Sequence, residues 1–158
     1  MNLLPRLACC FSLLTLAGVA TAQDYTLGTL TIQQPWSQAL PPNSATAAAY
    51  FSISNSGTEN DVLLGVDTPL AGQASMHQHV GQDGMMKMQA VDSVLVPAAG
   101  SVAFKPMGYH VMLMDLAEDR TQLQAGQQFP LTLHFQRGGD ITVEVDVLSD
   151  APASAHSH

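Results

Sequence analysis

Two alternating runs in the stretch LTLHFQRGGDITVEVDV, residues 131–147, decide the fold class. Leu131, Leu133 and Phe135 alternate with polar residues in the first run, and apolar residues from Ile141 to Val147 do so in the second. A period of two is that of a β-strand with one buried face. Similar short runs, separated by Gly, Pro, Asn and Asp, lie at 25–33, 47–54, 61–66, 93–96 and 101–105. The sequence therefore predicts an all-β protein, a single antiparallel sandwich or barrel.

Two segments between these runs lack the alternation. Residues 34–43 contain three prolines and the sole tryptophan, Trp36, and are expected to form a loop. Residues 117–127 are expected to contain a short helical turn.

The first 22 residues read as a cleaved signal peptide. Arg6 supplies the positive charge, residues 7–19 the apolar stretch, and Ala20-Thr21-Ala22 the small residues of a cleavage site. The apolar stretch is shorter than the roughly 20 residues that a spanning helix needs, so no membrane span is expected. We expect secretion through the Sec pathway to a bacterial periplasm, a folded domain over residues 23–150 and a disordered tail over 151–158. A lipoprotein anchor is the less favoured alternative, because Cys9 and Cys10 precede the apolar stretch.

Removing the signal peptide also removes both cysteines. The remaining chain can form no disulfide and no blue-copper centre, which requires a cysteine thiolate. The full sequence has 13 acidic and five basic residues, a formal net charge of −8. This charge argues against nucleic acid and anionic membranes as partners.

Seven of the eight methionines lie between Met76 and Met114, together with three histidines, His77, His79 and His110. Thioether and imidazole together suit a soft, low-valent ion such as Cu(I). Flexible methionines can also simply fill an irregular core. The histidines at both ends of residues 76–114 favour a metal site.

The register of two strands would bring these residues together. If residues 81–84 form a four-residue loop, His77 lies opposite Met88. In the later strand, alternation places His110, Met112 and Met114 on one face. The result is a cluster of two histidines and two methionines.

The spacing His77-x10-Met88-x21-His110-x-Met112 resembles the motif of the periplasmic copper chaperones known as PCuAC. The resemblance extends to Trp36, residues 47–55 and residues 86–113, with departures at Gln78 and Met107. It implies a cupredoxin-like (Greek-key) β-sandwich that binds one Cu(I) per chain through His77, Met88, His110 and Met112. It also implies delivery of copper to the CuA domain of cytochrome c oxidase subunit II.

The other candidate ligands are weaker. His79 shares a face with His77 and is an auxiliary candidate, as is Met114. His134 is expected to be solvated, and His156 and His158 form at most a weak second site for Cu(II). We expect a monomeric carrier and not an enzyme, with passive copper sequestration as the alternative. An enzyme such as a copper oxidase, or an adhesive module with an incidental methionine patch, is less favoured.

Overall fold

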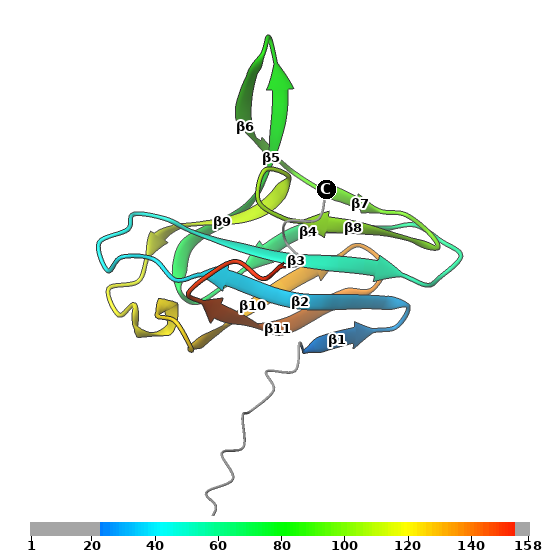
Figure 1. The fold of residues 1–158 in the computed structure, drawn as a ribbon. Coiled ribbons are helices and arrows are strands. Elements are labelled where there is room, and N and C mark those ends of the chain that lie inside the picture. Colours follow the sequence, from blue (N-terminus) through cyan, green and yellow to red (C-terminus); the bar gives the residue numbers. More distant parts are fainter. Residues whose placement is uncertain (1–22, 154–158) are drawn as a thin grey trace, which may run out of the picture.

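The computed structural model describes residues 23–153, which form eleven strands and one short 3-10 helix (Figure 1). The predicted signal peptide and the His156 and His158 tail lie outside this range. The strands are β1 Asp24–Leu27, β2 Leu30–Gln38, β3 Ala47–Asn55, β4 Asp61–Asp67, β5 Ala71–Gln82, β6 Met85–Val91, β7 Val94–Val96, β8 Gly100–Phe104, β9 Tyr109–Leu116, β10 Gln128–Phe135 and β11 Gly139–Leu148. The helix η1, Thr121–Leu123, is the helical turn expected within residues 117–127.

The strands form one continuous hydrogen-bonded path in the order β6-β5-β9-β8-β3-β2-β11-β10-β4-β7, and β1 pairs with β2. Figure 1 shows this sheet folded over on itself, with β3, β8 and β9 above β10 and β11. The predicted all-β, cupredoxin-like sandwich is confirmed. Two neighbouring pairs, β2 with β11 and β8 with β9, run parallel within the otherwise antiparallel order.

The core is built from the residues whose alternation predicted it. Leu131, Leu133, Val143 and Val145 are fully buried, and Phe135 is nearly so. Fully burying one such side chain stabilises a fold by about 1.5–3 kcal/mol. Both layers contribute to a single apolar cluster, so the body has a core independent of any bound metal.

The loop predicted for residues 34–43 is wrong in its first half. Strand β2 continues through Pro35 and Trp36 to Gln38, with a register shift between Gln33 and Trp36. Proline lacks the N–H of a sheet ladder but is tolerated at such irregularities. Trp36 is buried and packs against Tyr50 with 4.6 Å between ring centroids.

The register predicted for the β5–β6 hairpin is also wrong, by two residues. The turn is Asp83-Gly84, with φ of 52° and 75°, and Gln82 pairs directly with Met85. Asp-Gly favours a two-residue turn with positive φ at both positions, so the loop is shorter than the four residues expected. His79, and not His77, therefore lies opposite Met88, while His77 lies opposite Ala90. A two-residue shift keeps each side chain on its predicted face.

Strand β5 is longer than its neighbour β9. Its pairing with β9 ends at Gln78 and Tyr109, after which β5 pairs with β6 alone. Figure 1 shows the tip of this hairpin projecting from the body. His77 and His79 lie at the point where the hairpin leaves the sandwich.

Candidate metal centre

His110 is the most buried residue of the candidate site, with 4% of its surface exposed. Its Nδ1 lies 3.2 Å from the carbonyl oxygen of Gly108, which can only accept a hydrogen bond. In the neutral ring Nδ1 therefore carries the proton and Nε2 carries a lone pair. That Nε2 lies 3.1 Å from the sulfur of Met88. Two lone-pair donors thus face each other, an arrangement that a soft cation would stabilise.

His77 lies directly opposite His110 in the β5–β9 register, with 5.7 Å between ring centroids. Its Nε2 lies 3.0 Å from the hydroxyl of Ser75. Its Nδ1 is buried and has no hydrogen-bond partner among residues 23–153. Buried polar atoms are rarely left unpaired, and a missing ion is one reason for such an atom.

Met112 lies on the same face as His110, as alternation predicted. Its β9 neighbours on the other face, Val111 and Leu113, are fully buried in the core. Met112 is half-buried and lies opposite Ser75, one same-face position along from the His77–His110 pair. Diagonal neighbours across a strand pair are within reach of long side chains. The structure thus places all four predicted ligands on adjoining positions of one surface.

The electrostatic setting of His110 favours its neutral form. Burial lowers the pKa of His110, and the neighbouring His79 and His77 lower it further, against an opposing hydrogen bond to Gly108. Only neutral imidazole can bind a metal ion. The lowered pKa therefore keeps His110 available as a ligand at neutral pH.

The methionines between residues 76 and 114 differ in their burial. Met76 is buried in the core, as the packing explanation would have it. Met85, Met86, Met88 and Met107 are exposed large apolar side chains. Of these, Met86 and Met88 share the hairpin face that carries His77 and His79. Core filling therefore accounts for Met76 but leaves the methionines of the hairpin unexplained.

Sulfur ligands or movement of the rings would be needed to complete a site in this arrangement. Within residues 23–153, no group of three His, Cys, Asp or Glu side chains is already arranged to hold a metal ion. A site at His110 must therefore draw on sulfur or on movement of the neighbouring rings.

Sequence reasoning missed two groups that orient the rings, Ser75 and the Gly108 carbonyl. Ser75 stands two residues before His77, so its shared face was visible from alternation. The Gly108 contact depends on the turn before β9 and had no comparable signal.

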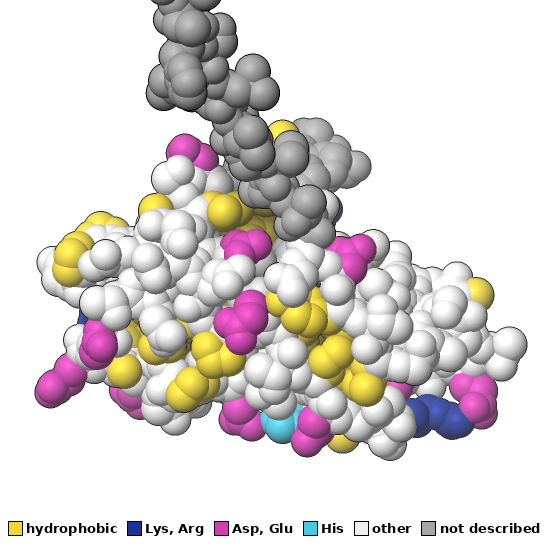
Figure 2. All heavy atoms as spheres, turned by 90° about the horizontal axis from the view of Figure 1, so that it is seen from below, with side chains coloured by type: hydrophobic (Ala, Val, Ile, Leu, Met, Phe, Trp, Pro, Cys, Tyr) yellow, Lys and Arg dark blue, Asp and Glu magenta, His cyan; other side chains and the backbone are white. Residues whose placement is uncertain are grey.

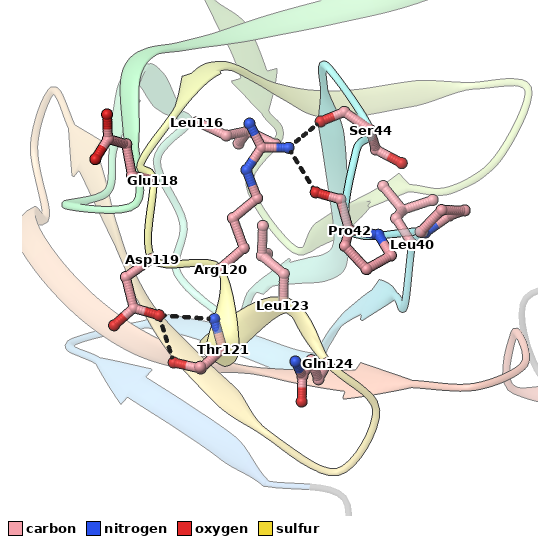
Figure 3. Close-up of a pocket in the computed structure, with 11 residues that line it drawn as sticks. Leu40, Pro42, Ser44, Leu116, Glu118, Asp119, Arg120, Thr121, Leu123 and Gln124 are labelled. Carbon is pink, nitrogen blue, oxygen red and sulfur yellow. Dashed lines mark hydrogen bonds between the residues drawn. The ribbon is translucent and has the colours of Figure 1, made fainter.

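Other parts of the surface are distinct from this cluster. A cavity of about 300 Å³ lies between residues 40–44 and 116–124, and none of its lining residues is a predicted ligand (Figure 3). Arg120 spans one side of it and donates hydrogen bonds to the carbonyls of Pro42, Ser44 and Ala117. This arginine ties the two segments together.

His134, expected to be solvated, is instead held between two carboxylates. Its Nε2 lies 2.6 Å from Asp67 and its Nδ1 2.8 Å from Asp140. Figure 2 shows acidic side chains scattered over the face seen from below, with few basic ones. A surface of this kind attracts cations more than anions.

A family model described as "Putative lipoprotein LpqE-like" matches residues 30–147, most of the chain. The chain belongs to the LpqE-like family. The "Putative lipoprotein Lxx21020" of Leifsonia xyli subsp. xyli is 30% identical over 117 residues, covering 73% of this chain and 68% of the relative. The "Uncharacterized protein RP573" of Rickettsia prowazekii is 29% identical over 123 residues, covering 75% and 66%. This LpqE-like chain thus spans about two thirds of the length of either relative.

Solved PCuAC structures share the fold of this LpqE-like protein. The copper-bound PCuAC domain from PmoF2 has a TM-score of 0.67 at 24% identity, covering 81% of this chain and 99% of that domain. The Cu(I) form of DR1885 from Deinococcus radiodurans has a TM-score of 0.58 at 29% identity, covering 83% and 84%. The predicted relationship to the PCuAC family is confirmed. In the range 23–153, no helix is long and apolar enough to cross a membrane.

Proposed function

We propose that this LpqE-like protein is a periplasmic carrier that binds one Cu(I) per chain through His77, Met88, His110 and Met112. The observation that carries the proposal is the lone pair of His110 Nε2 facing the sulfur of Met88 at 3.1 Å. The unpartnered Nδ1 of His77 beside it supports the same site. The 29% identity to DR1885, whose Cu(I) form has been solved, supports copper as the cargo.

The donor set suits the proposed compartment. Thioethers favour the cuprous ion and carry no proton to lose. They also stay available in an oxidising space, where thiols tend to become disulfides. The lipoprotein names of the family and of one relative support a location in the cell envelope.

The exposure of the site suits a carrier that must release its ion. Met88 is 47% exposed on a hairpin that projects from the body, whereas His110 is buried. One side of the ion would therefore be open to an acceptor. We propose the CuA domain of cytochrome c oxidase subunit II as that acceptor. Its cysteine thiolates are stronger donors to copper than thioethers, so transfer runs downhill.

Cuprous affinity tests the site. Cu(I) is titrated into wild-type protein against a competing chelator, beside Met88→Leu and Met85→Leu. Leucine keeps the volume and apolarity of methionine, so both variants should fold. Met85 lies on the same strand but on the opposite face, and serves as the control. Met88→Leu should lose at least about tenfold in affinity, with Met85→Leu unchanged. Equal affinities in all three proteins would remove Met88 from the site.

Delivery is tested with a reduced apo CuA domain. Cu(I)-loaded wild-type protein should metallate the acceptor, detected by the visible absorption of the CuA centre after oxidation. The double change His110→Ala and Met112→Leu should abolish delivery. If the wild-type protein keeps its copper against a reduced, competent acceptor, passive sequestration becomes the function of the same site.

A further inference from the structure

A third imidazole lies within the proposed copper site. The ring of His79 has its centroid 5.1 Å from that of His110, closer than the 5.7 Å that separates His77 from His110. Two imidazoles bound to one ion at about 2 Å place their centroids roughly 5–6 Å apart. Both distances are compatible with shared ligation.

The pairing of β5 with β6 also places His79 beside the proposed ligands. His79 lies opposite Met88, whose sulfur contacts the lone-pair nitrogen of His110. Its backbone N–H donates to the Gly108 carbonyl at 3.2 Å, which fixes this part of β5 beside the turn that leads into His110. The same carbonyl accepts the Nδ1 proton of His110. One carbonyl thus holds both residues in place.

The Nδ1 of His79 is buried and, like that of His77, has no hydrogen-bond partner in the part of the chain that the structure describes. The three rings are not yet converged on a single point, so binding requires rotation of their side chains. Rotating His77 and His79 breaks no hydrogen bond at either Nδ1. Converging the rings therefore has a small enthalpic cost at these atoms.

We propose that His79 is a third imidazole ligand, which allows this site to hold Cu(II) as well as Cu(I). Nitrogen-rich donor sets suit Cu(II), whereas thioethers select Cu(I). His77, His79 and His110 would bind Cu(II), and Met88 and Met112 would complete the site for Cu(I). This inference rests on the same site as the proposed function but concerns a different residue and a different ion.

The test uses Cu(II) alone and residues 23–158, the chain without its predicted signal peptide. All proteins carry His156→Ala and His158→Ala, which removes the histidine tail as a source of Cu(II) signal. Wild type at position 79 is compared with His79→Gln, and His134→Gln serves as the control because that ring is bound by Asp67 and Asp140. Pulsed electron paramagnetic resonance counts the imidazole nitrogens, and competition with glycine gives the affinity.

We expect three imidazoles in the parent protein and in His134→Gln, and two in His79→Gln. Cu(II) affinity should fall at least about tenfold in His79→Gln, since loss of a ligand exceeds loss of an outer partner. A second variant, His79→Met, should also lose the third imidazole while retaining cuprous affinity. Circular dichroism confirms that each variant is folded.

The outcomes separate the two proposals. If Cu(I) binding depends on Met88 but the Cu(II) spectrum and affinity are the same with and without His79, the role of His79 is disproved and the carrier function stands. If the parent protein binds no Cu(II), the inference is likewise overturned. If Cu(I) binding is absent while a three-imidazole Cu(II) signal depends on His79, the inference holds and the carrier function fails.

Discussion

The position of the proton on each imidazole decides which nitrogen can accept a metal ion. At His110 the Gly108 carbonyl fixes the proton on Nδ1 and turns Nε2 toward Met88. At His77 the hydroxyl of Ser75 lies 3.0 Å from Nε2. If that hydroxyl accepts the proton of Nε2, Nδ1 is left with a lone pair at the unpartnered position. Ser75 is then a positioning residue for His77.

Changing Ser75→Ala should weaken Cu(I) binding without unfolding the protein. Outer partners of ligating histidines typically contribute about 10–100-fold to metal affinity, and we expect the lower end because Ser75 is not fully buried. Chelator competition measures the change. Ser101→Ala, an exposed strand serine on β8, is the control. Equal affinities in the two variants would show that the Ser75 contact does not orient the ring.

His134 gives a pH-dependent contribution to stability that is separate from the site. Hydrogen bonds to Asp140 and Asp67 raise the pKa of His134. A raised pKa means that the folded state favours the charged ring, so this stabilisation is fully present below the unfolded pKa of about 6.5. It is lost as pH rises through the folded pKa.

Comparison of wild type with His134→Gln isolates this contribution. Urea unfolding should show a larger stability difference at about pH 5.5 than at about pH 8.5. The difference should stay below about 1 kcal/mol, because the partner carboxylates are exposed and screened by solvent. A stability difference that is the same at both pH values would mean that the two ion pairs add no net stability.

At the scale of single elements, the β5–β6 hairpin positions Met88 relative to the body. Its two-residue turn requires positive φ at Asp83 and Gly84. Gly84→Ala introduces a Cβ at φ of 75°, a left-handed conformation that costs an alanine about 1 kcal/mol. Because the hairpin projects from the body, we expect a modest loss of cuprous affinity with little change in global unfolding.

Gly126→Ala is the matched control for this prediction. Gly126 has φ of 85° and open space around its Cβ position, as Gly84 has, but it lies in the loop before β10. Gly126→Ala should lower the free energy of unfolding without lowering the cuprous affinity. A fall in affinity for both variants would indicate that the site responds to general destabilisation and not to the hairpin turn.

The hairpin also shows where sequence reasoning succeeded and where it could not. The faces of His77, Met88, His110 and Met112 followed from a period of two, which does not depend on loop length. The identity of the residue opposite Met88 did depend on loop length. The sequence Gly81-Gln82-Asp83-Gly84 fits a turn of two residues or of four. The choice between them is made by the pairing of the whole hairpin, including contacts of β5 with β9 that are distant in sequence.

Trp36, in the core, is a second residue whose position could not be predicted from the local sequence. Prolines on both sides of it predicted a loop, since proline interrupts a sheet ladder. The register shift after Gln33 accommodates Pro35, and packing on Tyr50 holds the strand in place. That contact joins β2 to β3 and has no local signature in the sequence.

At the scale of the whole molecule, the core should fold without copper. The buried apolar cluster spans both layers and contains none of the four proposed ligands. Many small metal domains unfold when the metal is removed, but here the site lies outside the core. The apo protein should show a β-type circular dichroism spectrum and one cooperative thermal transition.

Copper should then add stability by binding the folded state. Free Cu(I) buffered at about 100 times the dissociation constant should contribute about 2.7 kcal/mol. The thermal midpoint should rise in wild type and in Met85→Leu, and rise less in Met88→Leu at the same free Cu(I). An apo protein that lacks a cooperative transition would show that copper is part of the fold.

The position of β6 at the end of the sheet also bears on the kinetics of release. Among the described strands it pairs with β5 alone, and nearly all of its residues are exposed, Met88 among them. The proposed ligands on β9, His110 and Met112, belong to a strand with neighbours on both sides. An incoming thiolate could therefore replace the thioether of Met88 first, while imidazoles still hold the ion. Copper would leave by stepwise associative exchange through a mixed complex, at a rate that rises with acceptor concentration, and would never be free in solution.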